Sequence, residues 1–199
     1  MSKKIKITST IVLIIIGLIM FFSYIYNNLR STASISPLSH IQSGDLILSV
    51  GDSFKSRVVK ALEGNADISI NYSHIGVFLR NTDSVHIVHM SIDDGFIKRE
   101  SLKDFIENND VIAYDIYRLA GAIHHPERLY SIIDSVADSQ KPFDRLFDME
   151  SDDSYYCTEF IYKTFLQAGI TDIKEIEYEK YLYPNDVVDS QIFIKLEKH

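Results

Sequence analysis

Cysteine is almost absent from this sequence, because the 199 residues include only one, Cys157. A single cysteine cannot form an intramolecular disulfide, so the fold must be stabilised by its hydrophobic core. In an exported protein, a leftover cysteine is either an intermolecular bridge or a reactive thiol. The sequence also contains no CxxC or HExxH pattern, no internal repeat and no low-complexity segment. We therefore expect neither a metal nor another cofactor.

Basic residues are scarce outside the N-terminus. The chain has 20 Lys and Arg against 28 Asp and Glu, and four of the basic residues lie in residues 1–30, where no acidic residue occurs. The remaining residues therefore carry 16 basic and 28 acidic side chains, a net charge of −12. No basic stripe for a phosphate backbone is present, so we expect no nucleic-acid partner. The same acidic balance argues against docking on anionic lipid headgroups.

The N-terminal segment is basic at first and then apolar. Lysines come first, and Ile11–Tyr26 follows without a charge, close to the roughly 20 apolar residues that span a bilayer. Lysines before the span and a single Arg30 after it predict a cytoplasmic N-terminus. We therefore predict a hydrophobic helix in residues 1–30 that anchors the chain in the membrane through residues 11–26, with the rest at the periplasmic or extracellular face. A cleaved signal peptide and an exported domain form the alternative.

Periodicity after this segment predicts one domain of the α+β class. Residues 31–41 are polar and form a linker, and residues 42–199 form the domain. Short apolar and β-branched runs predict strands at 43–51, 72–80, 84–91, 111–119 and 191–197. Helical spacing and start signals predict helices at 53–65, 101–110, 125–140 and 157–169, and a turn at 183–190. This order of elements favours an α+β architecture over alternating strand–helix units.

Cys157 lies where the last of these helices is expected to begin. Ile161, Phe165 and Ala168 share one face of that helix. The unpaired N–H groups and the dipole of a helix N-terminus favour a thiolate, and the same groups can stabilise an oxyanion. The alternative is a buried, inert cysteine, since free cysteine is among the most buried residue types.

A nucleophilic cysteine needs a base, normally histidine. Four of the seven histidines fall in the linker, at a helix start or at the C-terminus: His40, His124, His125 and His199. The others, His74, His86 and His89, share one predicted hairpin, and His74 can also be read as a partly exposed strand-end residue. His86 and His89 are three residues apart in a strand, so they point to opposite faces and only one can contact His74. Spacing alone does not choose between them.

Several short motifs occur together in a recognisable order. They are "SGDLIL", "SHIGV", "IVHMS", "KPFDRLF", "CTE" and "YPNDVV", and they extend over residues 42–190. In this order they resemble the permuted papain-like cysteine hydrolases of the YiiX/YaeF-like group, which are related to NlpC-type peptidases and to lecithin retinol acyltransferase-like proteins. The resemblance implies a circularly permuted papain-like (NlpC-type) fold, with an antiparallel sheet or small barrel packed against helices.

The resemblance also implies roles for particular residues. Cys157 corresponds to the nucleophile, His74 to the base, and His89 to the third polar residue that orients the base. The YiiX-like pattern carries a glutamate at this third position, whereas NlpC-type enzymes use histidine. Glu159 is expected to serve the structure, as an acidic residue in the first turn of the helix.

The activity implied by the resemblance is hydrolysis of an amide bond through a thioester, without a cofactor. The substrate would be a small amide, a cell-wall-type peptide or an N-acyl lipid. Two alternatives remain open, a lipid acyltransferase that uses the same thioester chemistry and a non-catalytic binding module that kept the fold.

Overall fold

The computed structural model describes residues 18, 20, 38–51 and 72–198 of the chain. The chain divides into two compact units, Met1–Pro37 and Leu38–His199, and the strands and helices named below belong to the second. The predicted N-terminal hydrophobic helix lies almost entirely outside the described residues, and the predicted helix at 53–65 lies wholly outside them. Among the residues that are described, no helix is both long enough and apolar enough to cross a membrane.

A six-stranded antiparallel sheet is the centre of the second unit, in the order β4-β3-β2-β1-β5-β6. The strands are β1 Leu46–Gly51, β2 His74–Arg80, β3 Val85–Ser91, β4 Phe96–Glu100, β5 Val111–Leu119 and β6 Phe193–Lys198. The predicted α+β class is therefore confirmed, and of the two predicted forms, a sheet and a small barrel, the described residues form the sheet.

Strand β4 is the strand that the sequence does not predict. Of its five residues, only Ile97 is a buried apolar side chain, and Phe96 is exposed. Glu100 is buried on the side of the strand where a sheet normally places apolar residues. The strand therefore lacks the apolar alternation that identifies the others, and it is held by pairing with β3.

The helices of the described residues are η1 Leu38–His40, α3 Leu102–Asn108, α4 Pro126–Asp138, α5 Cys157–Gln167, η2 Thr171–Glu175 and α6 Pro184–Asp189. Three of the predicted helices are present as α3, α4 and α5, whereas the sequence does not predict η1, η2 and α6. The predicted turn at 183–190 is wrong, because α6 is a short helix. Pro184 occupies its first position, and the Asp186 carboxylate accepts a hydrogen bond from the Tyr183 N–H at 2.6 Å. Proline and aspartate act here as helix start signals rather than as turn residues.

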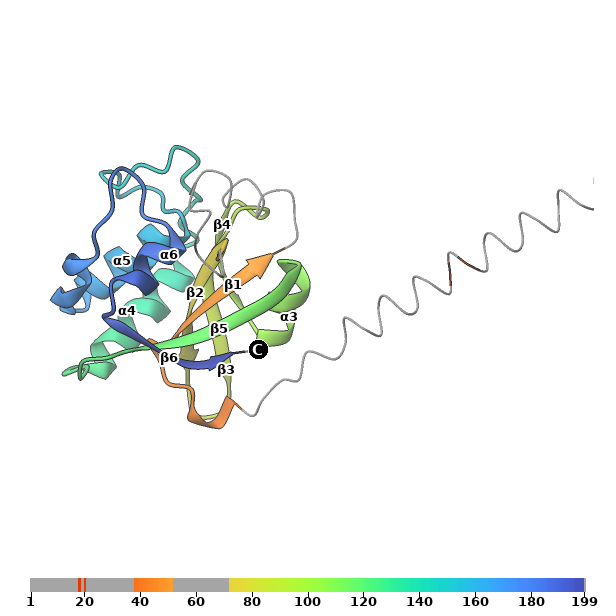
Figure 1. Ribbon diagram of the computed structural model, residues 1–199, viewed down its shortest axis with the longest axis horizontal. Coiled ribbons are helices and arrows are strands. Elements are labelled where there is room, and N and C mark those ends of the chain that lie inside the picture. Colours follow the sequence, from red (N-terminus) through yellow and green to blue (C-terminus); the bar gives the residue numbers. More distant parts are fainter. Residues whose placement is uncertain (1–17, 19, 21–37, 52–71, 199) are drawn as a thin grey trace, which may run out of the picture. The chain divides into compact units, whose positions relative to one another are not determined.

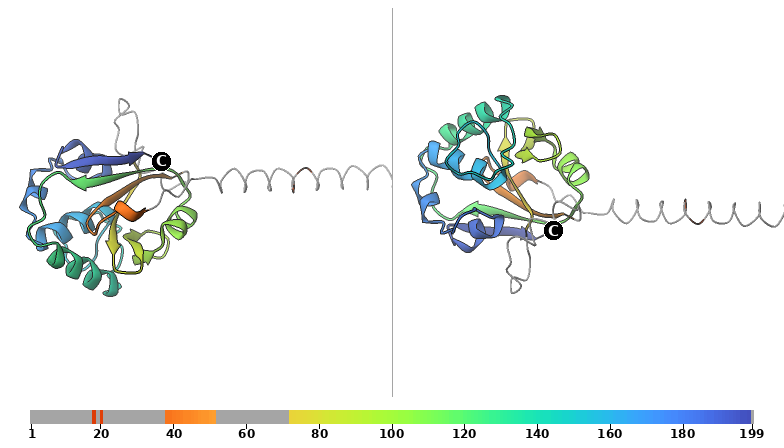
Figure 2. Two further views of the ribbon diagram at one scale, coloured as in Figure 1. Left: turned by 90° about the horizontal axis from the view of Figure 1, so that it is seen from below. Right: turned by 90° about the horizontal axis from the view of Figure 1, so that it is seen from above.

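Alternation along the strands divides the core in two. Leu46 and Leu48 of β1 belong to the α5-side core, which includes Phe160 of α5. Ile47 between them belongs to the α3-side core, which includes Phe105 of α3. Helices α4 and α5 thus cover one face of the sheet and α3 covers the other (Figures 1 and 2). The two cores supply different parts of the candidate site.

Candidate active site

Cys157 is the first residue of α5, as predicted from the apolar spacing that follows it. Its helix start is fixed by Glu159, which is fully buried and accepts a hydrogen bond from the Tyr156 N–H at 3.1 Å. Lys163, one turn later, contacts the same carboxylate at 3.0 Å. Glu159 therefore serves the helix start, as expected, and the thiol stands where the backbone N–H groups of α5 are unpaired.

The two histidine rings meet on the opposite face of the sheet, in the α3-side core. His74 opens β2, His89 lies in β3, and His74 Nε2 is 2.8 Å from His89 Nδ1. Phe105 of α3 stacks on the His74 ring, with centroids 5.8 Å apart, and meets the His89 ring edge-on at 5.0 Å. His86 points away and contacts Ser84 Oγ at 2.8 Å. The structure therefore places His89, and not His86, beside His74.

Gly76 makes room for this pair of rings. A Cβ at position 76 would lie 2.7 Å from Ile87 Cγ2 and 3.2 Å from His89 Cβ. Both distances are shorter than the roughly 3.5–4.0 Å at which carbon atoms pack without strain. The glycine of the "SHIGV" motif thus lets β2 and β3 carry the two histidines on the same face.

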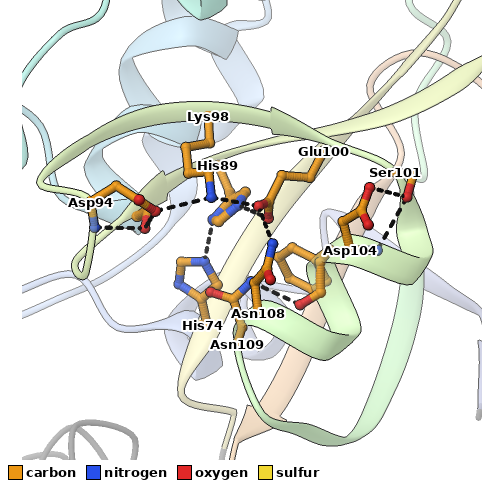
Figure 3. Close-up of polar contacts among 11 residues, drawn as sticks. His74, His89, Asp94, Lys98, Glu100, Ser101, Asp104, Asn108 and Asn109 are labelled. Atoms are coloured by element: carbon orange, nitrogen blue, oxygen red, sulfur yellow. Dashed lines mark hydrogen bonds and ion pairs between the residues drawn. The ribbon is translucent and has the colours of Figure 1, made fainter. Parts of the chain in front are cut away.

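Glu100 extends the histidine pair by one more residue (Figure 3). Its Oε2 is 2.9 Å from His89 Nε2, while its Oε1 is 2.6 Å from Lys98 Nζ and accepts a hydrogen bond from Asn108 Nδ2 at 2.7 Å. Burial alone would raise the pKa of Glu100, but the hydrogen bonds from His89, Lys98 and Asn108 lower it to about 2. Glu100 is therefore a carboxylate at neutral pH.

Sequence reasoning does not find Glu100, because it lies on the unpredicted strand β4. The register of β3 and β4 pairs His89 with Lys98 and Ile87 with Glu100, so Glu100 is the diagonal neighbour of His89. The available signal is the glutamate that the YiiX-like pattern carries at the position of His89. In this chain a carboxylate is present one hydrogen bond further from the base.

Cys157 and His74, which opens β2, line the same cavity, of about 80 Å³. The backbone N–H of Ile75, the residue after His74, approaches the sulfur, as do those of Cys157 and Thr158. The cavity is completed mainly by polar and aromatic residues, among them Ser73, Asn108, Asn109, Phe143 and Phe147.

Cys157 and His74 are both neutral near pH 7. Burial raises the pKa of the Cys157 thiol to about 11, although the N–H groups of Thr158, Ile75 and Cys157 oppose this rise. Burial and the neighbouring His89 lower the pKa of His74 to about 3. The expectation of a thiolate at the helix N-terminus is thus wrong, because burial raises the pKa of the thiol by more than the helix N–H groups lower it.

A second, apolar cavity of about 180 Å³ lies on another side of Cys157. Its walls combine aromatic and aliphatic side chains from the start of α5 and from the segment before α6. They are Phe147, Tyr156, Cys157, Thr158, Tyr181, Leu182, Tyr183 and Pro184. Cys157 thus stands between an apolar cavity and the cavity that contains His74.

The fold is similar to that of a solved structure described as the metalloprotein yiiX from Escherichia coli O157:H7. The two chains are 21% identical, the match covers 79% of this chain and 97% of that one, and the TM-score is 0.58. No match was found among curated proteins. Within residues 38–51 and 72–198, no group of three or more His, Cys, Asp or Glu side chains is arranged to hold a metal ion. The described residues therefore do not form a metal site.

The sequence also matches a family across most of its length. Residues 40–197 match the family described as permuted papain-like amidase enzymes, YaeF/YiiX, C92 family. This range contains β1, the histidine hairpin and the cysteine helix α5. The chain therefore belongs to the YaeF/YiiX family of permuted papain-like amidases.

Proposed function

We propose that this amidase cleaves its substrate through a thioester on Cys157, with His74 as the base and His89 as the residue that orients His74. One observation carries the proposal. A line of hydrogen-bonding contacts from Glu100 through His89 to His74 ends in the cavity that also contains the only thiol of the chain.

The proposed reaction has two halves. In the first, His74 takes the proton of Cys157 while the sulfur attacks the carbonyl carbon, and it then gives that proton to the leaving amine as the C–N bond breaks. In the second, water attacks the thioester carbon and loses a proton to His74, which returns it to the sulfur as the acid leaves. Backbone N–H groups at the start of α5 would stabilise the oxyanion in both halves.

The neutral resting pair affects how the first half begins. Because the thiol and the imidazole are both uncharged, proton transfer has to accompany the attack on the carbonyl. The developing charges then appear only in the transition state, where the N–H groups near the sulfur favour the negative one. This arrangement supports a nucleophile that stays protonated until a substrate is bound.

The apolar cavity supports a preference in the acyl part of the substrate. Its lining of tyrosine, phenylalanine, leucine and proline would take an apolar acyl group or side chain. The leaving amine would then lie in the cavity on the side of His74. Among the expected substrates, this favours an N-acyl amide, or a peptide with an apolar residue next to the scissile bond.

A lipid acyltransferase is the second candidate, because the same apolar cavity and thioester would serve it. The two activities differ only in whether water or another nucleophile takes the acyl group.

The location of the domain is also a proposal. The lysines before Ile11–Tyr26 and the lack of charge within that run support an anchor or export signal. The amidase domain would then act on amides outside the cytoplasm.

A panel of p-nitroanilides with acyl groups from acetyl to octanoyl tests the proposed function. Release of p-nitroaniline should increase with the apolar size of the acyl group until the cavity is filled. Rapid quenching followed by mass spectrometry should detect the acyl group on Cys157, and hydroxylamine should release it as a hydroxamate. Added amines or alcohols that become acylated in preference to water would identify an acyltransferase.

Three variants decide the roles of the residues. Cys157→Ala and His74→Ala should abolish release, while His86→Ala, a histidine of the same hairpin on the other face, should retain it. Full release by Cys157→Ala would refute the nucleophile, and no release by the wild type with any acyl group would refute this substrate class.

A further inference from the structure

Glu100 lies one hydrogen bond beyond the two histidines and outside the set of Cys157, His74 and His89. We propose that Glu100 is a positioning residue that fixes the tautomers of both histidines, so that Nδ1 of His74 is unprotonated and available to the thiol. The proposal rests on the proposed function, because the tautomer matters only if His74 acts as a base.

The carboxylate of Glu100 fixes a proton on His89 Nε2. Glu100 is only 7% exposed, and both of its oxygens have partners (Figure 3). An ionised carboxylate accepts hydrogen bonds and cannot donate them, so the contact at 2.9 Å requires a proton on His89 Nε2. Lys98 Nζ lies 2.6 Å from the other oxygen of Glu100 and 3.0 Å from Asp94 Oδ2, so the two carboxylates share one ammonium group.

The tautomer of His89 in turn determines the tautomer of His74. A neutral imidazole carries a proton on one nitrogen and a lone pair on the other. In the proposed state, a neutral His89 with its Nε2 protonated accepts at Nδ1, and the nitrogen 2.8 Å away, His74 Nε2, donates. The lone pair of His74 is then on Nδ1. Each assignment follows from the one before, and the first is set by Glu100.

Phe105 holds the two rings in place but does not determine their tautomers. Phe105 packs against both rings, with centroids 5.8 Å from His74 and 5.0 Å from His89. The rings can therefore keep their contact without Glu100, but its direction can reverse, with His89 Nδ1 donating to His74 Nε2. His74 would then carry its proton on Nδ1, where it cannot accept the proton of a thiol. Glu100 therefore determines which direction the hydrogen bond between His74 and His89 takes, while the ring positions stay the same.

The tautomers can be measured directly on the full-length protein. Long-range 1H–15N spectra of the imidazole rings separate protonated from unprotonated nitrogens, and His74→Ala and His89→Ala identify the two sets of signals. In the wild type, Nε2 should be protonated and Nδ1 unprotonated in both rings. A protonated Nδ1 on His74 in the wild type would overturn the proposal.

Variants of Glu100 test whether this residue sets the histidine tautomers. Glu100→Ala should produce a mixture of His74 tautomers and should slow alkylation of Cys157 by iodoacetamide roughly 10- to 100-fold, by analogy with the loss of the hydrogen-bond partner of a metal-bound histidine. Glu100→Met, which fills the space, serves if the alanine variant does not fold. Glu100→Gln keeps one acceptor oxygen, for which His89, Lys98 and Asn108 then compete. The imidazole spectrum and the alkylation rate of this variant should therefore fall between those of wild type and Glu100→Ala.

Asp45→Asn is the matched control, because Asp45 is also a buried carboxylate in an ion pair, with Arg118 at 2.7 Å. It should leave the histidine spectrum and the alkylation rate unchanged. Wild-type tautomers and rates in both Glu100→Ala and Glu100→Met would overturn the positioning role, even if p-nitroanilide cleavage proceeds. Altered tautomers in a protein that cleaves no amide would support the positioning role and refute the proposed function instead.

Discussion

Replacing Gly76 by alanine should destabilise the protein and disturb the histidine pair together. The new Cβ would lie 2.7 Å from Ile87 Cγ2, a buried methyl group, and 3.2 Å from His89 Cβ. Neither neighbour is the free end of a flexible side chain, so the two strands have to shift. A shift of a few tenths of an ångström at His89 lengthens its contact with His74, which is 2.8 Å in the wild type.

The expected cost follows from two opposing effects. Forcing an extra carbon into a packed core costs about 1–3 kcal/mol. Alanine also restricts the unfolded chain, which stabilises the folded state by about 0.4–1 kcal/mol where the backbone conformation suits any residue. Gly76 has such a conformation, because its φ is not in the left-handed region. The net loss in the free energy of unfolding should be about 0.5–2 kcal/mol.

Urea unfolding of a double-mutant cycle with Ile87→Ala measures this effect. Removing the Ile87 methyl group removes the main clash, so the two substitutions together should cost less than the sum of each alone, by about 0.5–3 kcal/mol. Gly121→Ala is the matched control, because its nearest neighbour would be 3.5 Å away, and it should be close to neutral. The packing argument is refuted if the Gly76 and Ile87 effects add, or if Gly76→Ala leaves both stability and p-nitroanilide cleavage unchanged.

Four further predictions concern charge and location. The pKa of His74 is lowered from 6.5 to about 3, so the unfolded chain binds a proton that the folded site does not, and this histidine lowers the free energy of unfolding as the pH drops from about 6.5 towards 3. Glu159, whose pKa is raised to about 6, acts in the opposite direction between about pH 6 and 4.5, so the His74 effect is measured as the difference in free energy of unfolding between the wild type and His74→Gln, which should shift in favour of the variant as the pH falls. The pKa of Cys157 is raised to about 11, so its alkylation without substrate should still accelerate above pH 9, and an inflection near the usual value of about 8.5 would contradict this. His89→Glu would place a second carboxylate beside Glu100 and should abolish cleavage, whereas adding Glu100→Gln should restore part of it; full activity of the single variant would argue against the contact. Reporter fusions after residue 35 and at the C-terminus should both be exported, and a cytoplasmic signal from either contradicts the role given to residues 11–26.

The elements that the sequence predicts are those with a clear apolar pattern. Strands β1, β2, β3 and β5 are short apolar and β-branched runs, helix α4 has one apolar face, and the structure contains each of them. Strand β4 escapes prediction because Lys98 and Glu100 occupy its inward face, where polar residues serve the site rather than the core. Helix α6 escapes because proline and aspartate start both turns and helices, and only its contacts in the fold decide between them.

The features of the site also divide into those that the sequence predicts and those that it does not. Cys157 and His74 follow from residue type and position in an element, and strand alternation leaves a single histidine of the pair able to reach His74. The contact of His89 with Glu100 depends on the register between two strands, which no local pattern specifies. The charge state of Cys157 depends on how much protein surrounds the sulfur, and the start of α5 alone suggests the opposite direction.

The two cores of the sheet have a consequence for how substitutions reach this site. Cys157 packs with the α5-side core, whereas His74 and His89 contact Phe105 of the α3-side core. Strands β1, β2 and β3 contribute alternate residues to both cores, so a shift of a strand is transmitted to the thiol and to the histidines alike. A substitution in a helix that packs on one face acts first on only one of them. The proposed nucleophile and its base can thus be perturbed separately through the helices and together through the strands.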